Sequence, residues 1–258
     1  MTDQTINHAR RLRRFFIPAS LQAVPEGSSL ELHEDETSHL RKVLRLGTGD
    51  SCLVTDGKGY EATAMIVAFS AAGRAQLRVL GVRKPHAKKG PVIRVYPAMI
   101  QKAKIEYLVE KAQELEIEGM TPMETSRSIV KMAASESEKA MKRWQKLACE
   151  AAKQSGSLYL IEISKPVKFK TAFADAPGRK IVFHPSDKNF TSTPFNVWLK
   201  TVKPEDELSI FFGPEGGFTD EEINSISKNA DVVQLTETVL KADTAMLGVL
   251  AGLRFLFS

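Results

Sequence analysis

The spacing of apolar residues changes near residue 90 and divides the chain into two regions. Before that point, short apolar runs alternate with turns, a pattern typical of half-buried strands. After it, apolar residues recur every three or four positions in long segments that alternate with short apolar strands. We therefore expect a first domain over residues 1–81 and a second over 92–258. The linker over 82–91 contains two prolines, a glycine and four basic residues.

The first region reads as a small β-barrel-like module. A hairpin-type turn, Asp56-Gly57-Lys58-Gly59, separates two of its strands, and a helix over 35–46 has one apolar side. The basic residues Arg41, Lys42 and Arg45 lie on or beside that helix. Strands are predicted over residues 15–18, 51–55, 62–69 and 75–80.

The second region alternates strands with helices, which predicts an α/β fold with a parallel sheet covered by helices. Gly156 follows a long helical pattern, as a glycine that ends a helix does. The apolar segment 246–257 contains Arg254 and is too short to span a bilayer, so it reads as a buried helix. Strands are predicted over 92–96, 120–125, 180–183, 208–212 and 232–235, and long helices over 102–117 and 136–155.

Basic residues are clustered, although the net charge of the chain is only +5. Three clusters lie within the first 104 residues: Arg10 to Arg14, the Arg41, Lys42 and Arg45 group, and the segment 81–104, which has seven basic residues and no acid. Such clusters are typical of proteins that bind a phosphate backbone, while any one of them alone fits an ordinary solvated surface. The distant Cys52 and Cys149 indicate neither a metal site nor a disulfide framework, and a reducing cytoplasm is the simplest setting.

A glycine-rich turn joins the strand over 208–212 to a helix. It contains Gly213, Pro214, Glu215, Gly216 and Gly217, and Thr219 with Glu222 forms a capping-box pattern at the helix start. Phosphate loops use bare amides and a nearby cation, whereas this turn carries Glu215 and is followed by three acids. The turn therefore favours an adenosine-like ligand with a positive centre, such as the sulfonium of S-adenosylmethionine. The alternative is a tight turn with no ligand.

A second unusual segment, residues 239–245, opens the last helix. In that helix the small residues Ala245, Gly248 and Gly252 recur along one face. They permit close approach of another helix, in this chain or in a second copy. Asp243 stands at the helix start, where a simple capping role is an alternative to chemistry.

These motifs together resemble the RsmE family of 16S rRNA (uracil-N3)-methyltransferases, in the SPOUT superfamily. The most specific combination is GPEGG at 213–217 followed by Leu240-Lys241-Ala242-Asp243-Thr244-Ala245. The likeness covers nearly the whole chain and also includes residues 13–17, 39–46, 56–57, 110–115, 126–128, 143–146, 150–156 and 184–185.

The resemblance implies an N-terminal PUA-like RNA-binding β-barrel and a C-terminal domain with a deep trefoil knot, a rare exception to unthreaded topology. It also implies a cytoplasmic homodimer that acts on 16S rRNA of the small ribosomal subunit without a metal or a membrane. S-adenosyl-L-methionine would bind at His184, Pro185, Gly213, Pro214, Glu215, Gly216, Gly217, Phe218, Leu240, Lys241, Ala242, Asp243, Thr244 and Ala245. RNA would bind at Arg13, Arg14, Arg41, Lys42, Arg45, Lys102 and Arg127.

N3 of uracil carries a proton at neutral pH, so methylation there requires a base or a group that stabilises the anion. Arg127 is the candidate for anion stabilisation or phosphate anchoring, with a structural ion pair as its alternative. Asp243 or Glu215 is the candidate proton acceptor. We expect Arg127→Ala to lower methylation with cofactor affinity nearly intact, and Gly216→Val to abolish cofactor binding.

Some positions depart from the family pattern. Lys241 stands where arginine is usual, Asp243 where glutamate is commoner, Ser157 where arginine is frequent, and Glu116 where glycine is usual. Two other functions stay open from sequence: a non-catalytic RNA-binding or assembly factor, and a related methyltransferase that acts on another RNA base. An enzyme of phosphorylated nucleotides is disfavoured by the acids near the glycine turn.

Overall fold

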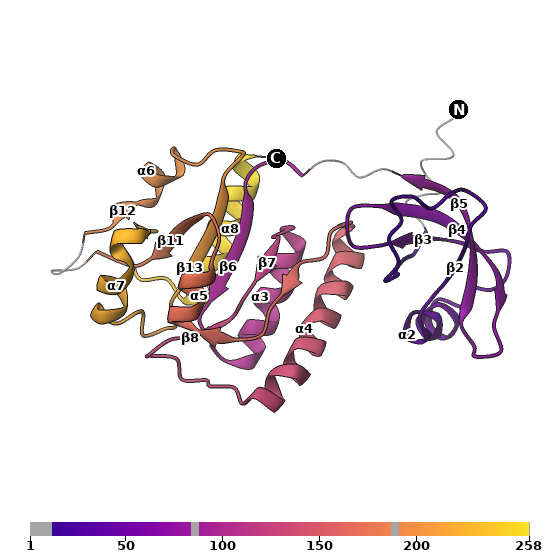
Figure 1. Cartoon of the computed structure of the whole chain (residues 1–258), viewed down its shortest axis with the longest axis horizontal. Coiled ribbons are helices and arrows are strands. Elements are labelled where there is room, and N and C mark those ends of the chain that lie inside the picture. Colours follow the sequence, from indigo (N-terminus) through magenta and orange to yellow (C-terminus); the bar gives the residue numbers. More distant parts are fainter. Residues whose placement is uncertain (1–11, 84–87, 187–190, 258) are drawn as a thin grey trace. The chain divides into compact units, whose positions relative to one another are not determined.

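The computed structural model describes residues 12–83, 88–186 and 191–257. It divides into two compact units (Figure 1), each with its own core. Unit 1 comprises Met1–Ala87 and Ala152–Leu160, and unit 2 comprises Lys88–Ala151 and Ile161–Ser258. Unit 1 thus includes the end of a long helix and the segment after it, which lie outside the range expected for the first domain.

Unit 1 is built on a five-stranded sheet in the order β1-β3-β4-β5-β2, in which only the β1–β3 pair is parallel. Asp56 organises the turn between β3 and β4, because its Oδ1 accepts the amides of Lys58 and Tyr60 and its Oδ2 accepts that of Leu21. The predicted hairpin turn is therefore confirmed. The elements are β1 (Arg14–Phe16), β2 (Ser29–Glu31), α2 (Glu34–Ser38), the π-helix η1 (His39–Val43), β3 (Ser51–Thr55), β4 (Glu61–Phe69) and β5 (Ala75–Arg83).

Sequence patterning missed β2 and predicted a single helix over 35–46. The structure places a short α-helix there, followed by the π-helical turn η1. Arg45 follows η1 with φ of 56°, a left-handed conformation that is uncommon for a residue other than glycine. A regular helix therefore does not continue through Leu46.

Unit 2 contains a seven-stranded sheet, and all of its strand pairs are parallel. Its order is β12-β14-β11-β13-β6-β7-β9. The strands of this sheet are β6 (Val92–Pro97), β7 (Gly119–Met120), β9 (Glu162–Ile163), β11 (Arg179–Phe183), β12 (Thr193–Pro194), β13 (Glu207–Phe212) and β14 (Asp231–Gln234). A separate parallel pair joins β8 (Met123–Glu124) and β10 (Val167–Lys168).

Helices cover both faces of this sheet, as strand–helix alternation predicted (Figure 1). Alternate residues of β13 point to opposite faces: Ile210 and Phe212 pack in the core that includes α3 and α8, while Phe211 packs in the core that includes α5 and α7. The helices are α3 (Lys102–Glu114), α4 (Ala134–Ser155), α5 (Phe169–Asp175), α6 (Phe195–Leu199), α7 (Asp220–Ile226), the 3₁₀ turn η2 (Ser227–Asn229) and α8 (Ala242–Leu256).

Two predicted elements differ from the structure at their ends. The strand predicted over 120–125 is interrupted at Thr121 and Pro122, so that β7 and β8 lie in different sheets. The helix predicted over 102–117 ends at Glu114, because Glu116 adopts φ of 53°. A glycine adopts this conformation without a Cβ clash, which gives a physical reason why glycine is usual at that position in the resembled family.

Candidate active site

Three loops at the carboxyl ends of the central parallel strands enclose a pocket of about 270 Å³. They follow β11, β13 and β14, and this end of a parallel sheet is where open α/β folds bind ligands. The pocket is lined by Arg127, Phe183, His184, Pro185, Phe212, Gly213, Pro214, Glu215, Gly216, Gly217, Phe218, Val239, Leu240, Ala242 and Ala245. The sequence-predicted cofactor loops thus meet, although Lys241, Asp243 and Thr244 do not line the pocket.

The glycine turn has the backbone path that its composition predicted. The amide of Gly217 donates to the carbonyl of Pro214 at 2.8 Å, and Gly217 has φ of 68°, which favours glycine. A Cβ at Gly213 would lie 3.2 Å from the ring of Phe218, so this position is crowded as well. Phe218 is buried and packs against Phe169 at 5.1 Å between ring centroids, which fixes the far end of the turn in the core.

The capping box at the start of α7 is confirmed. Thr219 Oγ1 accepts the amide of Glu222 at 3.2 Å, and Glu222 Oε2 accepts the amide of Thr219 at 2.9 Å. The other carboxylate oxygen of Glu222 accepts the amide of Ser126 at 2.8 Å. The sequence carried no signal for this third bond. Glu222, which is only 7% exposed, thereby joins the glycine turn to the segment that presents Arg127.

Arg127 holds the glycine turn directly. Its Nη1 donates to the carbonyl of Gly216 at 2.7 Å and to that of Phe218 at 3.2 Å. These two carbonyls flank Gly217 in sequence, so one guanidinium fixes both sides of the bend. No salt bridge of Arg127 occurs among the residues that the structure describes. The alternative to an RNA-facing role is therefore a structural role through these hydrogen bonds to backbone carbonyls, and not the ion pair considered from sequence.

Glu215 is paired with a lysine that sequence analysis had grouped with the basic clusters. Lys104 Nζ, at the start of α3, lies 2.7 Å from Glu215 Oε1. The hydrogen bond from Lys104 is the largest cause that holds the pKa of Glu215 below its ordinary value, while the nearby Asp243 acts in the opposite direction. Asp243 also helps to raise the pKa of Lys104, after the larger effect of Glu215. The three charged groups therefore form one interacting cluster.

The other two loops contribute mainly backbone and apolar surface. The amide of His184 donates to the carbonyl of Val233 at 3.0 Å, and the carbonyl of His184 accepts a hydrogen bond from Ser192 Oγ at 2.8 Å. Lys241 is the N-cap of α8, so Asp243 lies in the first helical turn, where its Oδ1 accepts the amide of Thr244 at 2.9 Å. Asp243 is therefore not the capping residue of this helix.

The predicted RNA-binding residues of unit 1 fall into different environments. Arg14 is only 15% exposed and donates two hydrogen bonds to Glu61, at 2.6 and 2.8 Å. This ion pair gives Arg14 a structural role that does not require RNA. Arg41 lies 4.7 Å from the centroid of the Phe69 ring and, with Lys42, lines a hollow of about 430 Å³. Arg10 and Arg11 lie outside the described residues. Arg13 and Arg45 are both exposed.

Within the described ranges, no group of three or more His, Cys, Asp or Glu side chains is arranged to hold a metal ion. No helix in residues 12–83, 88–186 or 191–257 is long and apolar enough to cross a membrane.

Two family models match the chain. Residues 88–254 match an RNA methyltransferase domain, and residues 32–79 match an RNA methyltransferase PUA domain. Among curated proteins, the chain is 25% identical over 250 residues to ribosomal RNA small subunit methyltransferase E of Bacillus subtilis, with 95% of this chain and 96% of that protein covered. It is 28% identical to the protein of the same name in Synechocystis, with 89% and 74% covered.

Solved structures also match the whole fold. A putative methyltransferase from Legionella pneumophila, in complex with bound SAM, superposes with a TM-score of 0.83 at 26% identity, with 95% of this chain and 98% of that chain covered. A ribosomal RNA small subunit methyltransferase E from Neisseria gonorrhoeae shares the fold, with a TM-score of 0.80 at 22% identity and the same coverage.

Proposed function

The chain belongs to the RNA methyltransferase family, and on this premise we propose that it transfers the methyl group of S-adenosylmethionine to N3 of a uridine in 16S rRNA. The chain aligns with 96% and 74% of the length of two relatives named ribosomal RNA small subunit methyltransferase E, and this likeness supports the substrate class. The choice of N3 of uridine rests on the RsmE resemblance in the motifs 213–217 and 240–245.

The residues of the candidate site fit the cofactor. The pocket has room for a small ligand, and Gly217 leaves open space where a Cβ would stand, so a bound molecule can approach the backbone. In the Legionella structure, SAM is bound by a protein with this fold at 26% identity. S-adenosylmethionine supplies an electrophilic methyl group on a cationic sulfur. His184, Pro185, residues 213–218 and residues 240–245 would hold it.

The proton on uracil N3 requires an acceptor, and the charged cluster distinguishes the two candidates. Lys104 holds the pKa of Glu215 low, which makes Glu215 a weak base. Asp243 has no ion pair among the described residues, and its Oδ1 accepts only a neighbouring amide. We therefore propose the carboxylate of Asp243 as the proton acceptor, although Asp243 itself does not line the pocket and only its neighbour Ala242 does. Glu215 with Lys104 would fix the glycine turn, and Arg127 would hold the turn while its remaining N–H groups face the RNA.

Several wider features belong to the same proposal. Residues 1–81 would form a PUA-like barrel that binds RNA, the linker would span 82–91, and residues 92–258 would form the catalytic domain with a trefoil knot. A homodimer is supported by apolar side chains exposed on α8, where Phe255 is 71% and Leu256 is 52% exposed. The small ribosomal subunit, in the cytoplasm, would be the substrate particle.

The test uses purified protein, isotopically labelled S-adenosylmethionine and small subunits from cells that lack the enzyme. We expect label in 16S rRNA, and nucleoside mass spectrometry should identify it as 3-methyluridine. Asp243→Asn should abolish transfer and retain cofactor binding, while the exposed Lys142→Ala serves as the control. Label in another nucleoside would overturn the assignment of N3, and no label in any rRNA would overturn the substrate class.

A further inference from the structure

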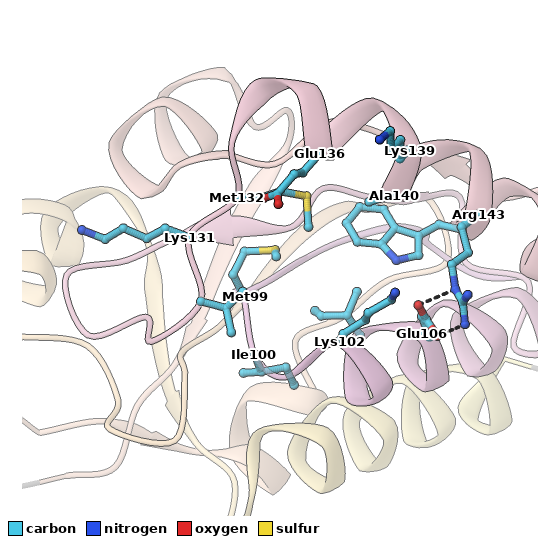
Figure 2. A pocket seen from close by; sticks show the side chains of 13 residues that line it. Met99, Ile100, Lys102, Glu106, Lys131, Met132, Glu136, Lys139, Ala140 and Arg143 are labelled. Carbon is cyan, nitrogen blue, oxygen red and sulfur yellow. Dashed lines mark hydrogen bonds and ion pairs between the residues drawn. The ribbon is translucent and has the colours of Figure 1, made fainter.

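A second cavity in unit 2, of about 440 Å³, lies between the start of α3, the segment 130–132 and the first half of α4 (Figure 2). It shares no lining residue with the active-site pocket. No step of the proposed reaction uses it. Its lining residues are Met99, Ile100, Lys102, Ile105, Glu106, Val130, Lys131, Met132, Glu136, Lys139, Ala140, Arg143 and Trp144.

The interior of this cavity is apolar and adaptable. Met99 and Trp144 are each 2% exposed, and Met99 and Met132 are turned toward one another in Figure 2. Thioethers adjust to irregular shapes and make favourable contacts with aromatic rings. A flat heteroaromatic ring therefore suits this interior, because both of its faces can meet apolar atoms.

The rim carries a surplus of positive charge. Lys102, Lys131 and Lys139 are exposed and form no ion pair within the part of the chain that the structure describes. Arg143 is paired with Glu106, with its Nε 2.6 Å from Oε1 and its Nη2 2.7 Å from Oε2. Glu136 is the other acid of the lining, and its Oε2 accepts the amide of Ala133 at 3.3 Å. The lining therefore has four cations (Lys102, Lys131, Lys139 and Arg143) against two acids (Glu106 and Glu136), a net charge of +2. An apolar interior with this surplus of positive charge fits an aromatic ligand that carries phosphate.

Both walls of the cavity continue into the active site. The segment that contributes Met132 also presents Arg127 to the glycine turn. At the start of α3, Lys102 lines the cavity, while Lys104 pairs with Glu215 of the glycine turn. A polynucleotide bound at the active site thus has a second, positively charged recess available on the same elements.

We infer that this cavity binds one unstacked nucleotide of the RNA substrate, at a position other than the methylated base. The base would lie against Met99, Met132 and Trp144, and its phosphates would lie near the rim lysines. Single-stranded RNA is commonly bound in this way, by apolar or aromatic contacts to bases together with cations along the backbone. The inference rests on the proposed function only in taking RNA as the ligand.

The test measures binding of a fluorescently labelled, single-stranded oligouridylate to the full-length protein over a range of salt concentrations. Ala140→Phe fills the cavity without a change of charge, and we expect about tenfold weaker binding, within the range for loss of one stacked base. Lys131→Ala with Lys139→Ala should weaken binding and reduce the salt slope by about 1.4, or about 0.7 per lost phosphate contact. The matched control is Lys142→Ala with Lys146→Ala, which removes the same charge from exposed positions of α4 outside the cavity.

A second measurement locates the nucleotide. Irradiation of the complex with an oligonucleotide that contains 4-thiouridine should cross-link peptides with Met99, Met132 or Trp144. The inference is overturned if both lysine pairs weaken binding equally while Ala140→Phe binds normally, because diffuse surface charge would then explain the affinity. Absence of cross-links in those peptides would also overturn it. The proposed function fails separately, if wild-type protein binds the oligonucleotide as described but transfers no methyl group to rRNA.

Discussion

Replacement of Arg127 by alanine should weaken cofactor binding, which differs from the expectation drawn from sequence. The guanidinium donates to the carbonyls of Gly216 and Phe218 at 2.7 and 3.2 Å, on either side of Gly217. A hydrogen bond from a charged donor contributes about 1.5 to 3 kcal/mol when little solvent competes. Since Arg127 is exposed and one nitrogen serves both acceptors, we take about 2 kcal/mol for the pair. That free energy corresponds to about 30-fold weaker binding of S-adenosylmethionine.

Calorimetric titration of S-adenosylmethionine into wild-type protein, Arg127→Ala and Arg127→Lys tests this reasoning. The lysine variant should be intermediate, because an ammonium group donates to a carbonyl but lacks the planar fork of arginine. Lys142→Ala, an exposed change on α4, is the control for loss of a positive charge. If Arg127→Ala binds the cofactor within about twofold of wild type and still loses methylation, the two backbone bonds do not hold the turn for the cofactor. The residue would then act on RNA alone.

Three further predictions concern single residues. Glu116→Gly should raise the free energy of unfolding by roughly 0.5 to 1 kcal/mol in urea titrations, because Glu116 has φ of 53°; a decrease would contradict the strain argument. Glu222→Ala should lower it by about 2 to 3 kcal/mol, through loss of the cap and of the acceptor for Ser126, whereas Glu222→Gln should cost less; equal losses would refute the role of the second oxygen. Lys104→Met should raise the pKa of Glu215 in a carboxyl NMR titration. A carboxyl group whose pKa is lowered by folding stabilises the fold at any pH above its pKa in the unfolded chain. The stability that Lys104 adds should therefore disappear as pH falls through the pKa of Glu215 in the folded protein. A difference in unfolding free energy between wild type and Lys104→Met that persists in acid would contradict the pairing.

The sequence predicted those parts of the site that depend on neighbouring residues. The glycine turn and the Thr219–Glu222 capping box follow from local backbone preferences, and both are confirmed in the structure. The strand β13 likewise follows from its mainly apolar run over 208–212, which is typical of a strand covered on both faces. Such features need only a few consecutive residues to specify them.

Contacts between distant segments could not be predicted in the same way. Glu222 reaches Ser126, 96 positions earlier in the sequence, and Glu215 reaches Lys104, 111 positions earlier. Both pairs depend on the order of strands in the sheet, which places β13 beside β6 although more than 100 residues separate them. The pattern of a single sequence does not say which distant strands lie side by side or in what register. The acidic partners of Lys104 and Arg14 could therefore not be predicted, and sequence alone places both residues in basic clusters.

The contacts of the acids also change the electrostatic argument about the glycine turn. Sequence suggested that several carboxylates near this turn attract a cationic ligand and repel phosphate. In the structure, the carboxylate of Glu222 accepts the amides of Thr219 and Ser126, and Glu215 is paired with Lys104. The same ion pair also engages the lysine that would otherwise be available to a phosphate group. A phosphate group at this turn would therefore meet a lysine that is already paired with Glu215, while Asp243 is the carboxylate of this cluster that we propose as the proton acceptor.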